Sequence, residues 1–321
     1  MTQSKDNADK NTKDIVLALR KKSKKLSTYN KKTLTKVALY FSPLYRDFIA
    51  KALNNSFLKI ELCYHDGSCQ PYISNDDSPT LRKREKTKIY VDLNTPDTLP
   101  HELGHAVDFF FGYDKALSKV VVLSSNKTLE ETFIEEFSTK KEEIYKEVMN
   151  EYRKVMDNSI GKGAFDTIIS NLPLYAKLKS IPSKSNDLEA KKQRKYLQRY
   201  LYESNFVETY YKLFEKGSFR LINLKYSPIL DALSSNYDLS HLFLEHHDIA
   251  YYEANSSFAP LEFFANLFEI KVTNKRVKSD SLIKLMPKSC VAFEELFYLF
   301  YNRLLKKKTF SDLRIKKGEK R

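Results

Sequence analysis

The sequence predicts one α+β domain that is mainly helical, with a small mixed β-sheet placed before a helix at residues 98–112. Two early segments, 57–65 and 87–93, alternate apolar and polar residues as half-buried strands do. Most of the chain after residue 98 has the periodicity of helices. With 321 residues and 42% hydrophobic content, the chain can bury a sizeable core.

The elements around these strands follow from local signals. Residues 33–53 have helical spacing that Pro43 interrupts. Residues 66–86, between the two strands, are rich in turn-forming residues and predict a loop. We therefore expect 87–93 to form an edge strand directly before the helix at 98–112.

Four later segments have helical periodicity: 128–157, 187–216, 260–272 and 289–307. The first two carry interleaved acids and bases, and Gly217 is a stop signal for the second. We expect these two helices to form an insertion at about residues 125–220 within a single domain spanning residues 31–305.

Positive charge gathers at the two ends of the chain. Residues 1–30 carry +5 and residues 306–321 carry +6 of the formal +14, which leaves +3 for the middle. We expect both ends to be basic, flexible tails that are solvated or that make weak, salt-sensitive contacts with nucleic acid or an anionic surface. Within the first tail, residues 14–22 could form a short amphipathic turn. The nearly balanced middle, without a recognised binding motif, argues against a dedicated nucleic-acid-binding protein.

Targeting signals and cysteine content indicate the cellular compartment of the protein. Charged residues occupy the positions where a signal peptide needs an apolar stretch, and no run approaches the roughly 18 apolar residues of a membrane helix. The sequence therefore predicts a cytoplasmic protein as synthesised, and delivery by a specialised secretion route stays open. Cys63, Cys69 and Cys290 are too few for a disulfide framework.

The helix at 98–112, "TLPHELGHAVDFFFG", contains two of the six histidines. His101 and His105 are four residues apart, so they project from the same helix face and can bind one metal ion. Glu102 lies between them, where it can hold a water that the metal activates. This is the HExxH arrangement of zinc peptidases. A histidine pair that is simply hydrogen-bonded in an apolar core is the alternative.

A catalytic zinc site needs a third protein ligand. Phe111 stands where an extended motif would have a third histidine, so we expect a carboxylate from "APLEFFANLFEIK" (259–271). There Glu262, Asn266 and Glu269 form a polar stripe on an otherwise apolar helix. Such carboxylates are costly to bury unless they are paired or bind a metal, and the competing interpretation is that they face solvent.

"HELGHAVD" together with "LEFFANLFE" resembles the zincin metallopeptidases of the anthrax lethal factor family, of the gluzincin type. The resemblance implies that His101, His105 and Glu262 bind Zn²⁺ and that Glu102 is the general base. Asn266 falls where that family has an acidic residue next to the ligands, so the match is imperfect. The 157 positions between His105 and Glu262 depart from the family by an insertion.

Two further patches, "SPILDALSS" (227–235) and "HHDIAYY" (246–252), resemble the zincin-like domains of phage head-associated proteins. Near a zinc ion, Tyr251 or Tyr252 could donate a hydrogen bond to the carbonyl oxygen as negative charge builds on it, and His247 could assist. Packing in the core is the alternative for each.

Asp108, three residues after His105, could hydrogen-bond the second nitrogen of a histidine ligand, or it could be an exposed helix carboxylate.

These patterns predict a zinc-dependent endopeptidase acting on a protein or peptide substrate, which could pair with the expected edge strand at 87–93. The alternative is a non-catalytic structural or interaction protein of a phage or mobile element that keeps the zincin shell. Glu102 favours the enzyme, because a purely structural metal site needs no base. A toxin or effector and a processing enzyme both fit this prediction.

Overall fold

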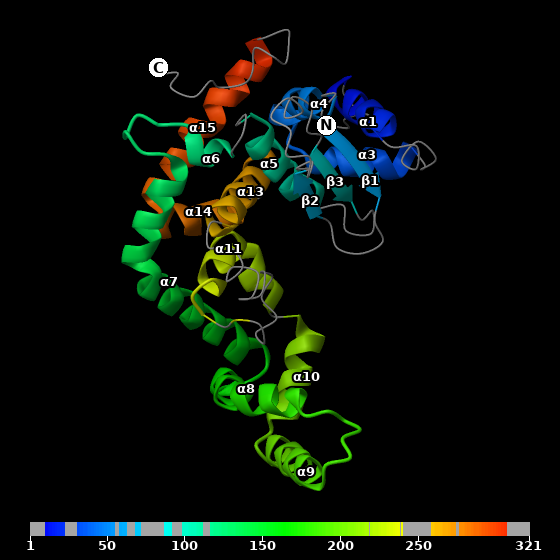
Figure 1. Cartoon of the computed structure of the whole chain (residues 1–321), viewed down its shortest axis with the longest axis vertical. Helices are drawn as coiled ribbons and strands as arrows, with labels where there is room; N and C mark the ends of the chain where they lie inside the picture. Colours follow the sequence, from blue (N-terminus) through cyan, green and yellow to red (C-terminus); the bar gives the residue numbers. More distant parts are fainter. Residues whose placement is uncertain are drawn as a thin grey trace, which may run out of the picture. The chain divides into compact units, whose positions relative to one another are not determined.

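A computed structural model describes residues 10–22, 31–54, 58–62, 68–71, 87–91, 98–111, 116–217, 219–237, 239, 258–273 and 276–306. The chain divides into two compact units (Figure 1). The first unit consists of Met1–Ser138 and Ser257–Arg321, and the second of Thr139–Ser256.

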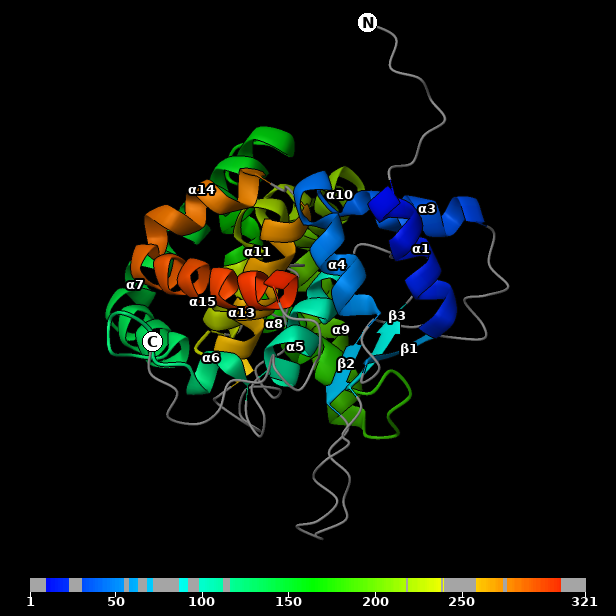
Figure 2. The same cartoon turned by 90° about the horizontal axis from the view of Figure 1, so that it is seen from above.

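The first unit begins with short helices: α1 (Lys10–Lys22), α3 (Lys31–Tyr40), the 3₁₀ turn η1 (Pro43–Tyr45) and α4 (Arg46–Leu53). Helix α1 packs against α3 and α4 (Figure 2). Ile15, Ala18 and Leu19 are almost completely buried. The predicted flexible tail is therefore wrong for this segment. The amphipathic turn considered for residues 14–22 is part of a longer helix, whose apolar residues pack into the core.

Three short strands follow: β1 (Leu58–Leu62), β2 (Ser68–Pro71) and β3 (Thr87–Val91). Their order is β1-β3-β2, with β1 parallel and β2 antiparallel to β3. Strand β3 is therefore central, and the prediction that it lies at an edge is wrong. The reason is that part of the expected loop forms β2 and pairs with the second side of β3.

The predicted α+β class also needs correction, because the described chain is mainly helical. The three strands have only four or five residues each and form a single small sheet, whereas the other described elements are helices. Ile89 on β3 is completely buried. The core is instead made by helices packing on helices.

Five further helices complete the described part of the first unit: α5 (Thr98–Phe111), α6 (Leu117–Val120), α13 (Phe258–Thr273), α14 (Arg276–Leu285) and α15 (Pro287–Lys306). The helices predicted at 98–112, 260–272 and 289–307 are confirmed within two residues. Helices α5 and α13 pack along each other (Figures 1 and 2). The face of β3 and β2 lies against α5.

Helix α13 is held by an aromatic core. The Phe264 ring lies 5.4 Å from Phe293, and the Phe268 ring lies 6.1 Å from Phe48 and 6.0 Å from Phe297, measured between centroids. Buried aromatic side chains contribute large apolar areas and favour specific ring geometries. Contacts of this kind with α4 and α15 therefore define where α13 lies.

Helix α7 (Leu129–Ser159) begins in the first unit with a capping box. The Thr128 hydroxyl accepts from the Glu131 main-chain N–H, and the Glu131 carboxylate accepts from the Thr128 N–H. These bonds satisfy two donors that the first helical turn leaves open. The start predicted at residue 128 is confirmed to within one residue.

We expect Glu136→Gln to lower the free energy of unfolding by about 2 kcal/mol. The buried Glu136 carboxylate accepts from the Ser289 N–H and hydroxyl, both at 2.8 Å, and from the Lys288 N–H at 3.2 Å, at the first turn of α15. A glutamine amide cannot accept all three bonds. Urea unfolding measures the loss, with Glu135→Gln as control, since Glu135 is an exposed neighbour. Equal losses in both variants would contradict the capping role.

The second unit contains the rest of α7, followed by α8 (Ala164–Ser180), α9 (Leu188–Glu203), α10 (Phe206–Lys216) and α11 (Phe219–Ser234). The single helix predicted at 187–216 is wrong. It breaks at Asn205, whose φ of 57° is left-handed, a conformation that asparagine adopts more readily than most residues. The predicted stop at Gly217, with φ 60°, is confirmed.

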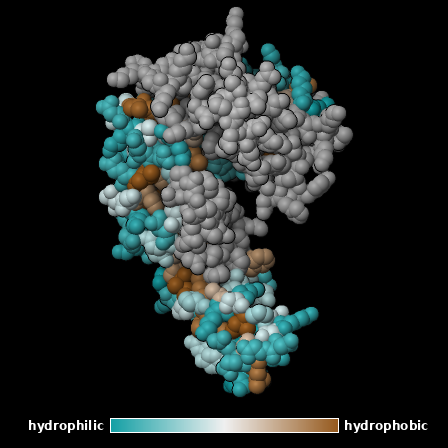
Figure 3. Space-filling view, in the orientation of Figure 1, coloured by the Kyte–Doolittle hydropathy of each residue, from teal (hydrophilic) through white to brown (hydrophobic). Residues whose placement is uncertain are grey.

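The boundaries of this unit differ from the insertion predicted at about 125–220. Helix α11, with Ile229, Leu230 and Leu233 buried, belongs to the second unit and extends it toward residue 256. Along α7, the described surface is largely hydrophilic (Figure 3), as its charged sequence predicts. The predicted C-terminal tail lies outside the described residues from residue 307 on.

Across the described helices, none combines the length and apolar character needed to span a membrane.

Cys290 is a free, buried thiol, and burial raises its pKa to about 12.

Candidate metal centre

Helix α5 presents both histidines of the HExxH motif. Pro100 lies in the first turn of this helix, where its missing N–H breaks no helical hydrogen bond. The His101 and His105 side chains are 19% and 11% exposed. Their Nε2 atoms lie 3.2 Å apart, and their ring planes are nearly perpendicular at 83°.

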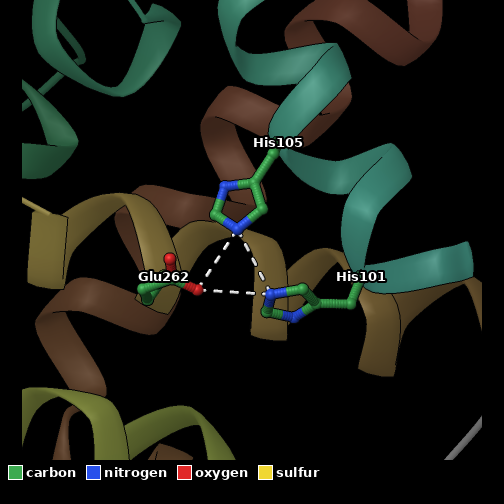
Figure 4. Close-up of side chains that lie close together, drawn as sticks. All are labelled: His101, His105 and Glu262. Carbon is green, nitrogen blue, oxygen red and sulfur yellow. Dashed lines mark hydrogen bonds and ion pairs between the residues drawn. The ribbon is translucent and has the colours of Figure 1, made fainter. Parts of the chain in front are cut away.

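Glu262 on α13 completes the cluster, although it lies 157 residues after His105. Its side chain is 3% exposed, and its Oε2 atom lies 3.2 Å from each histidine Nε2. Figure 4 shows the two imidazole rings and the carboxylate pointing toward one another. The three ligand-type atoms form a triangle with equal sides.

This triangle fits a metal ion. Tetrahedral zinc with ligands at about 2.0–2.1 Å separates the ligand atoms by about 3.3–3.4 Å, close to the spacing found here. Two imidazole nitrogens and one carboxylate oxygen are a donor set that zinc commonly takes. Without a cation, their lone pairs converge and only a proton can relieve the repulsion. The residues present therefore fit the metal that the motif predicts.

The surrounding charges favour a cation at this point. Burial lowers the pKa of His101, but the hydrogen bond and charge of Glu262, together with the charges of Glu102 and Glu269, outweigh it and raise that pKa to about 9. In the metal-free protein, a proton on His101 thus supplies the positive charge that a metal ion would otherwise provide. A bound metal would displace this proton.

The polar stripe on α13 is buried, so the alternative that it faces solvent is wrong. Glu262, Asn266 and Glu269 are 3%, 5% and 6% exposed. The Asn266 amide donates to the main-chain carbonyl of Glu262 at 2.9 Å, within the helix. Glu269 acts on His101 through its charge. The sequence placed Glu269 in the stripe but assigned it no role, although its position seven residues after Glu262 puts it on the same face.

Glu102 is 7% exposed and acts on its neighbour His101 through its charge. It is separate from the three residues whose ligand atoms converge. Tyr251, Tyr252 and His247, which the sequence predicts as catalytic, lie outside the described residues.

Asp108 holds α6 in place. It is completely buried, and its two oxygens accept from the Ser118 N–H and hydroxyl, each at 2.8 Å. Among the described residues it makes no hydrogen bond to a histidine ligand, and it is not exposed, so both alternatives from the sequence are wrong. The reason is that Ser118, at the start of α6, lies against Asp108 and takes both of its carboxylate oxygens as acceptors.

Asp108→Asn should remove one source of pH dependence. Burial raises the pKa of Asp108 from 3.8 to about 6, although the bonds from Ser118 lower it. The folded state therefore binds this proton more tightly than the unfolded chain, which stabilises the wild type as pH falls from about 6 toward 3.8. Two pKa units correspond to about 3 kcal/mol.

Urea unfolding of the metal-free wild type and Asp108→Asn at about pH 7 and about pH 4 tests this. The wild type should gain stability relative to the variant at the lower pH. Parallel pH profiles for the two proteins would contradict the raised pKa.

Together, the fold and this cluster define a mainly helical protein with a buried group of two histidines and one glutamate that suits a metal ion. Comparisons of the chain with protein-family models, with curated proteins and with solved structures give no match.

Proposed function

We propose that the protein is a zinc-dependent endopeptidase, in which His101, His105 and Glu262 hold the metal and Glu102 is the general base. The observation that carries the proposal is the triangle of ligand atoms with 3.2 Å sides, formed by an HExxH helix and a glutamate from a distant helix. The resemblance to zincin metallopeptidases supports it through the same residues.

A zinc ion in such a site supplies Lewis acidity, which polarises a peptide carbonyl and lowers the pKa of water. Glu102 would accept a proton from the attacking water at its carboxylate and return it to the leaving amine. Its position on α5, one residue after His101 and 7% exposed, places this carboxylate beside the candidate metal ligands. The fixed positions of the two histidines on one helix orient the ligands before substrate binds.

The number of ligands favours a catalytic site over a structural one. Structural zinc sites are usually closed by four protein ligands, whereas catalytic sites have three and keep one position open. In the described part of the chain, the converging group has three members. Glu102 favours the catalytic interpretation of these three described ligands, because a purely structural site needs no base.

Metal analysis and a cleavage assay test the proposal together. We expect about one zinc per chain and cleavage of a random peptide library that stops with a chelator and returns when zinc is added. Stoichiometric zinc without cleavage would contradict the peptidase and favour the non-catalytic alternative. Iron in place of zinc would contradict the metal assignment, because two histidines and a carboxylate also suit non-haem iron.

A further inference from the structure

Gly104 lies between His101 and His105 in the sequence, at a close contact of α5 with α13. A Cβ atom at this position would lie 2.9 Å from the Ala265 Cα, 3.1 Å from the Ala265 carbonyl oxygen and 3.1 Å from the Phe268 Cβ. Real Cβ atoms essentially never approach other atoms as closely as the first of these distances. The contact therefore requires a residue without a side chain.

Helix propensity offers no reason for this glycine. In a helix interior, glycine is less favourable than alanine by about 1 kcal/mol. Two of the three atoms that a Cβ would meet belong to the α13 backbone, so no side-chain rotation can relieve the overlap. The backbones of α5 and α13 would have to move apart at this contact.

The contact is adjacent to the metal centre on both helices. Gly104 directly precedes His105 on α5, and Ala265 lies three residues after Glu262 on α13. The separation of the two helices at this contact therefore sets the distance between the His105 Nε2 and Glu262 Oε2 atoms, which is 3.2 Å.

The size of the displacement decides its effect. Ordinary Cβ contacts begin at 3.4 Å, so an alanine at 104 needs a shift of about 0.5 Å from Ala265. Metal–ligand distances tolerate about 0.2 Å. We propose that Gly104 is a positioning residue that sets the ligand spacing of the metal centre. This inference rests on the metal binding in the proposed function.

The experiment compares full-length Gly104→Ala with Ala106→Gly. Ala106 is 3% exposed on the same helix, and its change to glycine weakens α5 without adding atoms. Zinc affinity is measured by competition with a chelator, and the ligand geometry by the absorption spectrum of the cobalt(II)-substituted protein. Urea unfolding of the metal-free proteins gives their stabilities.

We expect Gly104→Ala to lower zinc affinity by about 10- to 100-fold and to change the cobalt spectrum. Ala106→Gly should keep the zinc affinity and the cobalt spectrum near those of the wild type, even if this variant unfolds more easily. A purely structural role for Gly104 would change stability but leave affinity and spectrum as in Ala106→Gly. If Gly104→Ala is unfolded in buffer, binding is measured in an osmolyte that favours the folded state.

The two proposals fail in different ways. If the wild type binds zinc and Gly104→Ala binds it equally well, the positioning role is wrong and the metal site stands. If the wild type binds no zinc, the proposed function fails and the positioning role fails with it. Lower stability of metal-free Gly104→Ala, despite the helix preference of alanine, would still establish the close contact of the two helices.

Discussion

Glu262→Ala should lower zinc affinity by more than about 100-fold, beyond the range found for residues that only support a ligand. The change removes the one anionic ligand of the cluster, whose Oε2 lies 3.2 Å from both histidines. It also removes the largest influence that raises the pKa of His101. Two neutral imidazoles on one helix then remain, and they bind zinc weakly by themselves.

Glu269→Ala is the matched control for this variant. Glu269 is also a buried carboxylate on α13, but its ligand atoms are outside the converging group. We expect this variant to keep one zinc per chain with a smaller loss of affinity, because it loses no ligand atom and only the charge that favours a cation at His101. Elemental analysis after gel filtration distinguishes the two variants. Full zinc content in Glu262→Ala would mean that another residue is the third ligand.

Glu102→Gln should keep zinc and lose activity. Glutamine has nearly the same shape, but it cannot accept a proton at neutral pH, and general-base catalysis contributes about 10²- to 10⁴-fold to rate. We therefore expect kcat to fall by that factor while the metal content stays near that of the wild type. Peptide cleavage and elemental analysis on the same preparation measure both quantities.

The control for Glu102→Gln is Glu136→Gln, which makes the same change at a buried glutamate that caps α15. Under conditions in which Glu136→Gln is folded, this variant should cleave peptides at the wild-type rate. Full activity in Glu102→Gln would exclude Glu102 as the general base. Loss of zinc in that variant would show instead that Glu102 supports the metal centre.

Local patterns predicted the elements that carry the candidate site. The helices α5 and α13 were found because apolar periodicity, Pro100 and Pro260 define them within short windows. Local patterns predicted the wrong structure where packing against other parts of the chain determines it. The segment 10–22 was expected in a tail although α3 and α4 bury it, and 68–71 was expected in a loop although β3 pairs with it.

The sequence by itself determined that His101 and His105 share a helix face, because four residues make about one turn. It also placed Glu262, Asn266 and Glu269 on one stripe of an apolar helix. The resemblance singled out Glu262 from this stripe, but only the tertiary structure decided that the stripe is buried and that the Glu262 oxygen meets both histidines. That choice depends on how α5 and α13 pack across 157 residues of chain, with contact at Gly104, and no local window contains both partners.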